Sequence, residues 1–322
     1  MKRSRGLSDR FISDLKKGVL RPLLDRALDD ATLDLEIREN YINIYYRGGS
    51  LLKVSPAPRR PSCYVFKFDL NYFAKGKSSL VRELNSVVTP EDGIAQWVQV
   101  IPTLKDTMDL WFGKHPKDER ALQQMVVWEN NDSAWAGGTD WFVVDIEYDN
   151  HHGARFDLVA MRWDSVASAR KLTKGYIPRL AVIEMKAGDG ALTGDAGIAA
   201  HLDQLRGFFA DKKTIAEFKT EMLNVFQQKR DLGLIRALRT NKNSVKALDA
   251  EMDLVFLFAG HDPASRKLGR ILGDIAESKS AQIAEARICL CCSSLMGYGL
   301  YKENVRELKQ FLVDYAEQIE GC

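Results

Sequence analysis

The run Ala181-Val182-Ile183-Glu184-Met185-Lys186 is an apolar segment that ends in two charged residues at alternate positions. Its apolar, β-branched character predicts a buried strand. Because successive side chains of a strand point to opposite faces, Glu184 and Lys186 are expected to share one face. Charges on a covered sheet need a metal, a substrate or each other to offset the cost of burial. The run therefore indicates a core strand and a candidate site together.

A second strand-like run, Arg155-Phe156-Asp157-Leu158-Val159-Ala160, places one carboxylate within an apolar alternating pattern. Asp157 and Glu184 offer carboxylate oxygens, which suit the hard cations Mg²⁺ and Mn²⁺. Such a cation polarises a phosphorus centre and lowers the pKa of a bound water, while an ammonium group beside it stabilises developing charge. Two carboxylates and the Lys186 ammonium therefore fit the hydrolysis of a phosphodiester.

The predicted elements around these two runs follow the order helix, strand, strand, strand, helix, strand. Helical spacing is found over residues 104–112, 119–129, 197–210 and 211–239, and strand patterns over residues 141–148, 155–163, 180–186 and 253–259. A further strand is expected at residues 288–293 and a closing helix at residues 302–318. This order predicts an α/β fold with a mixed central sheet flanked by helices.

The first part of the chain predicts a smaller α+β region. Apolar spacing indicates one amphipathic helix over residues 8–29, and alternating patterns indicate strands over residues 33–46, 51–54 and 63–72. The turn sequence Arg47-Gly48-Gly49-Ser50 joins the first two of these strands. Because the pattern becomes helical from Pro102, we expect a division into residues 1–110, of unassigned role, and residues 111–322, which carry the candidate site.

Asp157 and the later Glu184-Met185-Lys186, on the second and third strands of this order, resemble the motif of the PD-(D/E)XK nuclease superfamily. The resemblance covers residues 117–260 and implies a restriction-endonuclease-like core. It also implies that Asp157 and Glu184 bind Mg²⁺ or Mn²⁺, that Lys186 handles the attacking water, and that the chain cleaves nucleic acid. DNA is the expected substrate. Phe156 stands where the motif name has proline, a departure that leaves the metal ligand untouched.

The helix expected after this strand adds two candidate catalytic residues, Gln204 and His201. Gln204 and Phe208 resemble the Gln-x-x-x-Tyr motif of the RecB-like branch, although Phe208 replaces the tyrosine. The resemblance implies that Gln204, together with His201, steadies the phosphate or the lysine. A histidine that faces a sheet also fits a hydrogen-bonded structural role, and both interpretations of His201 stay open.

An additional carboxylate, Glu147, lies near the end of the strand that precedes Asp157. If residues 149–154 close a hairpin, Glu147 falls opposite Asp157 and extends the metal site. An edge-strand acid that faces water is the other interpretation.

Residues 211–246 contain nine basic and four acidic residues, a local excess of five positive charges in a chain whose net charge is +2. Clustered bases suit a phosphate backbone, so this face is expected to bind nucleic acid without reading its sequence. The expected contacts are Lys229, Arg230, Arg236 and Arg239. A solvated helix surface is the competing interpretation.

The composition is that of an ordinary globular protein. The chain has 322 residues, 45% of them hydrophobic, and no run approaches the roughly 18 apolar residues of a membrane span. There are five cysteines, and the three at Cys289, Cys291 and Cys292 indicate residues of a core strand rather than a disulfide or a zinc site. We expect a cytoplasmic protein without membrane contact, and the sequence does not indicate its oligomeric state.

Two other functions compete with that of a nuclease. A catalytically inactive module of the same fold would bind nucleic acid in a salt-sensitive way, without metal-dependent cleavage. A structural or interaction protein would use Asp157, Glu184 and Lys186 as a buried ion-pair network. Loss of Lys186 distinguishes them, because it would strand two carboxylates in a structural network, whereas a metal site would keep its fold.

Overall fold

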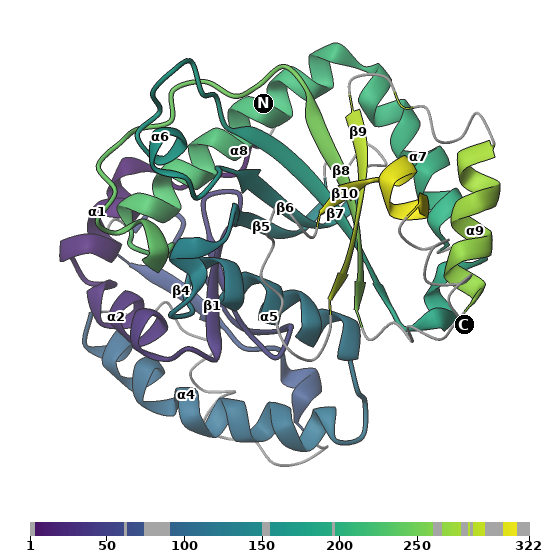
Figure 1. Ribbon diagram of the computed structural model, residues 1–322. Helices are drawn as coiled ribbons and strands as arrows, with labels where there is room; N and C mark the ends of the chain where they lie inside the picture. Colours follow the sequence, from purple (N-terminus) through teal and green to yellow (C-terminus); the bar gives the residue numbers. More distant parts are fainter. Residues whose placement is uncertain are drawn as a thin grey trace. The chain divides into compact units, whose positions relative to one another are not determined.

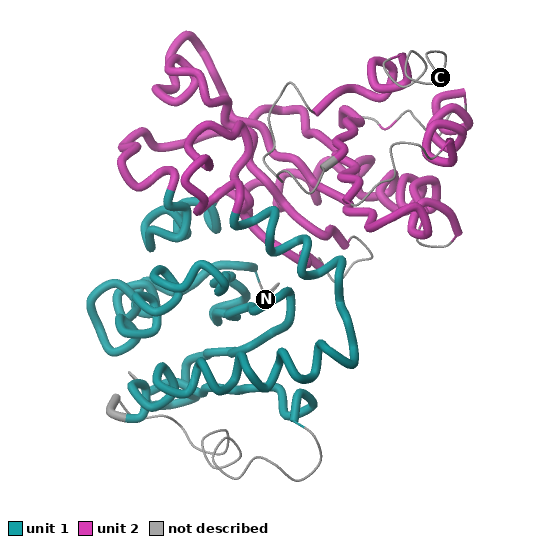
Figure 2. The backbone as a smooth tube through the Cα atoms, turned by 60° about the horizontal axis from the view of Figure 1, so that its bottom comes forward, with its two compact units in different colours: residues 1–128, 224–236 teal, residues 129–223, 237–322 magenta. Residues whose placement is uncertain are grey.

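The computed structural model describes residues 4–60, 63–73, 91–149, 155–194, 197–259, 266–277, 283, 286–293 and 305–313. The chain divides into two compact units, which Figure 2 colours separately. Unit 1 comprises residues 1–128 and 224–236, and unit 2 comprises residues 129–223 and 237–322. The division thus falls later than the expected residue 110, and unit 1 also takes the end of helix α8 (Lys212–Asp231).

Unit 1 begins with two short helices, α1 (Asp9–Lys17) and α2 (Arg21–Asp29), where the sequence predicted one. Gly18 ends α1 in an extended conformation, and Pro22 lies in the first turn of α2. Proline is well tolerated in a first turn, where its missing N–H would have no partner within the helix. The expectation of one helix over residues 8–29 is therefore wrong, because the chain leaves the helix at Gly18 and starts a new one.

The sheet of unit 1 has four antiparallel strands in the order β1-β2-β3-β4. They are β1 (Leu33–Ile37), β2 (Ile42–Tyr46), β3 (Gly49–Pro56) and β4 (Tyr64–Lys67). At the predicted turn between β2 and β3, φ is 49° for Arg47 and 71° for Gly48, the left-handed pair that a tight hairpin needs. Only glycine fits at position 48, because a Cβ there would lie 2.3 Å from the Arg120 carbonyl carbon. A 3-10 helix (Leu70–Tyr72), α4 (Glu91–Phe112) and α5 (Asp118–Asn131) follow this sheet.

Unit 2 is built on a mixed six-stranded sheet in the order β10-β9-β8-β7-β6-β5 (Figure 1). Its strands are β5 (Trp141–Asp149), β6 (Arg155–Arg162), β7 (Arg179–Ala187), β8 (Met252–Ala259), β9 (Ala286–Ser293) and β10 (Arg306–Glu307). Strands β5, β6 and β7 pair antiparallel, whereas β7, β8 and β9 pair parallel. The helices of this unit include α6 (Ala167–Arg170), α7 (Ile198–Ala210), most of α8, and α9 (Arg266–Glu277). The predicted α/β fold with a mixed sheet and a smaller antiparallel region is therefore confirmed.

The middle of the six-stranded sheet is buried. Every residue of β8 is buried, and ring contacts with centroids 5.0 to 5.7 Å apart join Tyr148 and Phe156 of β5 and β6 to Phe208 and Phe218 of α7 and α8. In β9, burial and the nearby Asp253 raise the pKa of the Cys289 thiol to about 12. Cys289 and Cys291 are core residues as the sequence predicted, whereas Cys292 is exposed.

Two predicted helices have different bounds in the structure. Helix α8 ends at Asp231 rather than at residue 239, because Gly233 turns the chain with a φ of 75°. In the segment expected to form the closing helix, residues 306–307 form β10, and helical residues run over 308–313. Residues 302–304 and 314–318 of that prediction lie outside the described residues.

No helix in the described ranges combines the length and the apolar content that crossing a bilayer requires.

Candidate active site

The second half of β7 carries the predicted charged pair, Glu184 and Lys186. Strands β6 and β7 pair antiparallel, and their register places Asp157 opposite Glu184, one position beyond the last paired residues. Where the ladder stops, the Asp157 Oδ2 accepts a hydrogen bond of 2.7 Å from the Met185 N–H. The topology therefore brings the two predicted carboxylates together at the point where two strands separate.

His201 of α7 connects Glu184 to Lys186. Its Nδ1 lies 2.8 Å from the Glu184 Oε2, and its Nε2 lies 3.4 Å from the Lys186 Nζ. Because a lysine ammonium can only donate, Nε2 must accept, and a neutral ring then carries its proton on Nδ1 and donates it to the carboxylate. His201 thus holds both charged groups with one imidazole. We call Asp157, Glu184, Lys186 and His201 the Glu184 cluster.

The Glu184 cluster is largely shielded from solvent. Glu184 is 2% exposed and Lys186 is 5% exposed, while the His201 side chain is 22% exposed. The Glu184 Oε1 is buried and has no hydrogen-bond partner in the described part of the chain. A buried carboxylate oxygen without a partner is costly, so a bound cation would offset a cost that the described side chains leave in place.

The third predicted metal ligand, Glu147, is placed opposite Asp157 by the register of β5 and β6, as expected. Glu147 has a left-handed φ of 47°, although the paired residues on either side of it keep one register. Among the residues that the structure describes, no group of three or more His, Cys, Asp or Glu side chains is arranged to hold a metal. The expected ligand set of Asp157, Glu184 and Glu147 is therefore not assembled, and the candidate ligands are reduced to Asp157 and Glu184.

The predicted Gln-x-x-x-Phe pair of α7 separates into two different environments. Gln204 is exposed, and no hydrogen bond from Gln204 to the Glu184 cluster is present within the described ranges. Phe208 is buried and packs against Phe156, with ring centroids 5.0 Å apart. Phe208 therefore contributes to the core. Of the two candidate catalytic residues, Gln204 and His201, only His201 contacts Glu184 and Lys186 among the described residues.

The four predicted phosphate contacts differ in their access to solvent. Lys229 is 1% exposed, and its Nζ pairs with the Glu36 Oε1 at 2.5 Å in unit 1. The prediction for Lys229 is therefore wrong, because its ammonium forms a buried ion pair with the Glu36 carboxylate. Arg230 is half-buried, and burial lowers the pKa of its guanidinium. Arg236 and Arg239 are exposed, but Arg236 belongs to unit 1 and Arg239 to unit 2.

A second charged cluster lies where β7 and β8 begin, at the opposite end of these strands from Lys186. The fully buried Asp253 accepts hydrogen bonds from Arg179 at 3.3 Å and from Arg287 at 3.2 Å, and Arg162 lies 3.8 Å away. We call Arg162, Arg179, Asp253 and Arg287 the Asp253 cluster. These residues were not among the predicted site residues, although Asp253, like Asp157, is a single acid in an apolar strand.

Together, the mixed sheet and the Glu184 cluster define an α/β protein with two carboxylates, a lysine and a histidine at one end of its central strands. Comparisons with models of protein families, with curated proteins and with solved structures find no match for this chain. Its function is therefore inferred from the geometry of the cluster.

Proposed function

We propose that this chain is a Mg²⁺-dependent nuclease with a restriction-endonuclease-like core, which hydrolyses phosphodiester bonds and has DNA as its expected substrate. The observation that carries the proposal is the buried Glu184 Oε1, which has no partner within the described residues. Asp157 supplies a second carboxylate beside it, and Lys186 supplies an ammonium linked to it through His201. Two carboxylates and one lysine suit metal-dependent hydrolysis of a phosphodiester.

Asp157 and Glu184 would hold the metal. Glu184 offers its Oε1, since its Oε2 is engaged by His201. Two carboxylates are sufficient for Mg²⁺, which keeps several waters and is commonly bound by one or two acids together with substrate phosphates. When bound, Mg²⁺ polarises the phosphoryl group and lowers the pKa of a bound water. A group of three carboxylates is therefore not required.

Lys186 and His201 are the groups that the chain itself brings to the chemical step. His201 accepts a hydrogen bond from the Lys186 ammonium and donates one to Glu184, which fixes the direction of the lysine. From this position the ammonium orients the attacking water and stabilises the negative charge that develops on the phosphoryl oxygens. Because Lys186 is 5% exposed, solvent screens this interaction weakly.

Exposed cations would supply contacts to the nucleic-acid backbone. Arg236 and Arg239 stay in the proposal because both side chains are exposed. Lys229 is excluded because it is buried against Glu36. Such contacts would give affinity without sequence preference.

A structural role for the Glu184 cluster is favoured by one observation, namely that His201 already links Glu184 to Lys186 without a ligand. In that case the cluster would stabilise the fold and no cleavage would be found. The inactive binding module is the other alternative, and it differs by retaining affinity for nucleic acid.

The test is incubation of the purified chain with supercoiled plasmid, linear DNA and RNA, in Mg²⁺ or in EDTA. We expect cleavage of at least one substrate in Mg²⁺ and none in EDTA. For substitutions of acids in the Glu184 cluster, the matched control is Asp203→Asn. Asp203 is an exposed acid on the same helix as His201 and pairs with Arg206. Binding without cleavage under both conditions would support the inactive module, and absence of both would support the structural role.

A further inference from the structure

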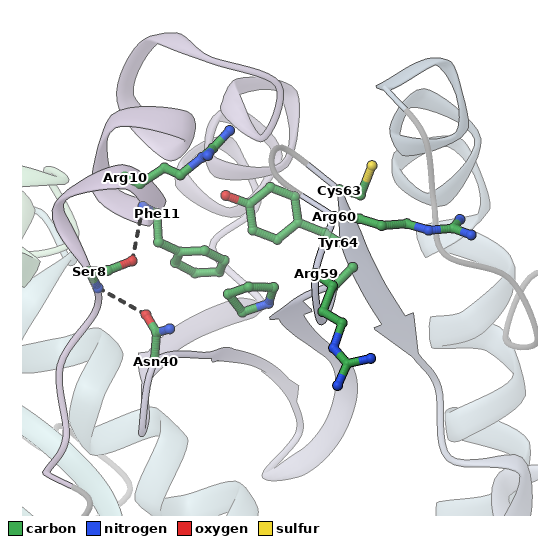
Figure 3. A pocket seen from close by; sticks show the side chains of 10 residues that line it. Ser8, Arg10, Phe11, Asn40, Arg59, Arg60, Cys63 and Tyr64 are labelled. Atoms are coloured by element: carbon green, nitrogen blue, oxygen red, sulfur yellow. Dashed lines mark hydrogen bonds between the residues drawn. The ribbon is translucent and has the colours of Figure 1, made fainter.

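A pocket of unit 1 has a strongly basic lining. It has a volume of about 290 Å³ and is formed by the start of α1, the β1–β2 turn, and the segment that joins β3 to β4. Arg10, Arg59 and Arg60 line it, and no acidic residue is part of the lining. Figure 3 shows their guanidinium groups on different sides of two aromatic rings, those of Phe11 and Tyr64.

The two aromatic rings give the pocket an apolar wall. Phe11 is 1% exposed and Tyr64 is 2% exposed, and their ring centroids lie 5.0 Å apart. The Tyr64 hydroxyl donates a hydrogen bond of 2.6 Å to the Asp14 Oδ2. Burial and this bond both raise the pKa of Tyr64, so its hydroxyl stays neutral near neutral pH. The wall therefore adds no negative charge to the pocket.

The three arginines are neutralised to different extents. Arg10 lies 3.9 Å from the Asp14 carboxylate, so part of its charge is offset. Arg59 and Arg60 are exposed and form no ion pair within the described residues. Ser8 caps the first turn of α1 at the same pocket by accepting from the Phe11 N–H, and a helix start adds positive potential.

Arg59 is held in a conformation that disfavours arginine. The Arg60 N–H donates to the Ala57 carbonyl, Pro58 occupies the second position of this turn, and Arg59 in the third position has a φ of 60°. This is the pattern of a type II turn, in which the third position favours glycine. A side chain in the left-handed region costs stability, so glycine would fit this position with less strain than Arg59 does.

We propose that this pocket binds the terminal phosphate of a nucleotide, either a free nucleoside monophosphate or the phosphorylated end of a nucleic-acid strand. A single guanidinium can bind two phosphate oxygens at once, and Arg59 and Arg60 are the lining arginines that form no ion pair among the described residues, which favours them as the principal contacts. The volume of about 290 Å³ lies just below the range of small-molecule sites, about 300–1,000 Å³, so the phosphate is the part of the ligand that the pocket would hold. The proposal does not rest on the nuclease function, because the Glu184 cluster belongs to unit 2.

The test compares ligands that differ only in the phosphate. Binding of a short oligonucleotide with a 5′-phosphate or a 5′-hydroxyl, and of a nucleoside monophosphate or its nucleoside, is measured by calorimetry in EDTA, which prevents cleavage. We expect the phosphate to tighten binding on the order of tenfold in at least one pair. Arg59→Gly and Arg60→Gln should each remove most of that preference. Lys67→Gln, an exposed lysine of β4 outside the pocket lining, should leave it unchanged.

Thermal unfolding of the Arg59→Gly variant separates binding from folding. Its midpoint should be unchanged or raised, because glycine accepts the left-handed conformation. A preference found only with the monophosphate would identify a free nucleotide as ligand, and one found only with the oligonucleotide would identify a strand end. Equal binding of phosphorylated and unphosphorylated ligands, or a preference that survives both substitutions, would overturn the proposal. Neither outcome depends on whether the chain cleaves in Mg²⁺.

Discussion

The Glu184 cluster and the Asp253 cluster lie toward opposite ends of the same sheet, and they balance buried charge differently. In the Asp253 cluster, one fully buried carboxylate faces three guanidinium groups. In the Glu184 cluster, two carboxylates face one ammonium and one imidazole, and the Glu184 Oε1 has no partner among the described residues. Buried charge by itself therefore does not distinguish the proposed functional site from a structural one, and the two clusters differ in the balance between carboxylates and cations.

The electrostatics of the Asp253 cluster are those of a structural network. Burial alone would lower the pKa of Arg287, but the charge and hydrogen bond of Asp253, together with the other negative groups nearby, outweigh burial and the pKa is raised. Arg179 also pairs with Asp249 at 3.1 Å, which extends the network toward solvent. The pKa of Arg179 is raised as well, so both arginines favour the charged form in the folded arrangement. The Glu184 cluster, in contrast, has one ammonium for two carboxylates, and under the proposal a bound cation would offset the remaining negative charge.

The largest effect is expected when the unbalanced charge is removed by Glu184→Gln. The amide keeps the shape and the oxygen that accepts from His201, but it loses the charge that binds a metal. We expect cleavage in Mg²⁺ to fall by at least about 10³-fold, because both metal binding and water activation depend on this site. The thermal midpoint should be unchanged or higher, since a buried charge is lost. Cleavage at near wild-type rate would show that the site is misassigned.

The matching change in the second cluster, Asp253→Asn, should affect stability instead. It is the same replacement of a carboxylate by an amide, but here three guanidinium groups lose the buried anion that they share. We expect the free energy of unfolding, measured by urea denaturation, to fall by about 3–5 kcal/mol, as when one partner of a buried ion pair is removed. The exposed control Asp203→Asn should change it by no more than about 0.5 kcal/mol. If Asp253→Asn lowered the free energy of unfolding less than Glu184→Gln does, the Glu184 cluster rather than the Asp253 cluster would be the structural network.

The contribution of Lys186 should be somewhat smaller than that of the metal ligands. For Lys186→Ala we expect retained binding of nucleic acid and a cleavage rate lower by about 10²-fold, since the ammonium acts mainly on charge that develops in the transition state. Lys186→Arg should restore only part of the rate, because a planar guanidinium cannot replace a compact ammonium. Single-turnover cleavage and thermal unfolding are measured for both variants. A large loss of stability that arginine repairs would favour the structural alternative.

The fold and the centre of the candidate site follow from short-range patterns. Alternation along β7 places Glu184 and Lys186 on one face, and the order of the elements predicts the mixed sheet. Local periodicity is sufficient here because each of these features depends on residues close together in the sequence or on neighbouring strands.

Features that depend on distant partners were not predictable. Its neighbours in the sequence place Lys229 on a basic helix, but the side chain is buried against Glu36. Because Glu36 lies 193 positions earlier in the chain, no local pattern indicates this pair. The left-handed conformations of Glu147, within β5, and of Arg59, in the turn after β3, are not indicated by either residue type. The Asp253 cluster gathers arginines from three strands around one acid. Local composition therefore identifies clustered lysines and arginines, but it does not identify the acids that pair with them.

The smallest expected effect concerns Asp249, at the solvent-facing edge of the Asp253 cluster. Burial would raise the pKa of Asp249, but hydrogen bonds from the Glu251 N–H and the Arg179 guanidinium, with the charges of Arg179 and Lys219, outweigh burial and lower it. A carboxyl whose pKa is lower in the folded state stabilises the protein above its unfolded value of about 3.9, and this contribution is lost as the pH falls through the folded pKa. Asp249→Asn should therefore be less stable than the wild type at pH 7, and the difference should shrink below about pH 4. Urea denaturation at a series of pH values measures this difference directly, and a gap that stays constant down to pH 2 would mean that the Asp249 charge does not stabilise the network.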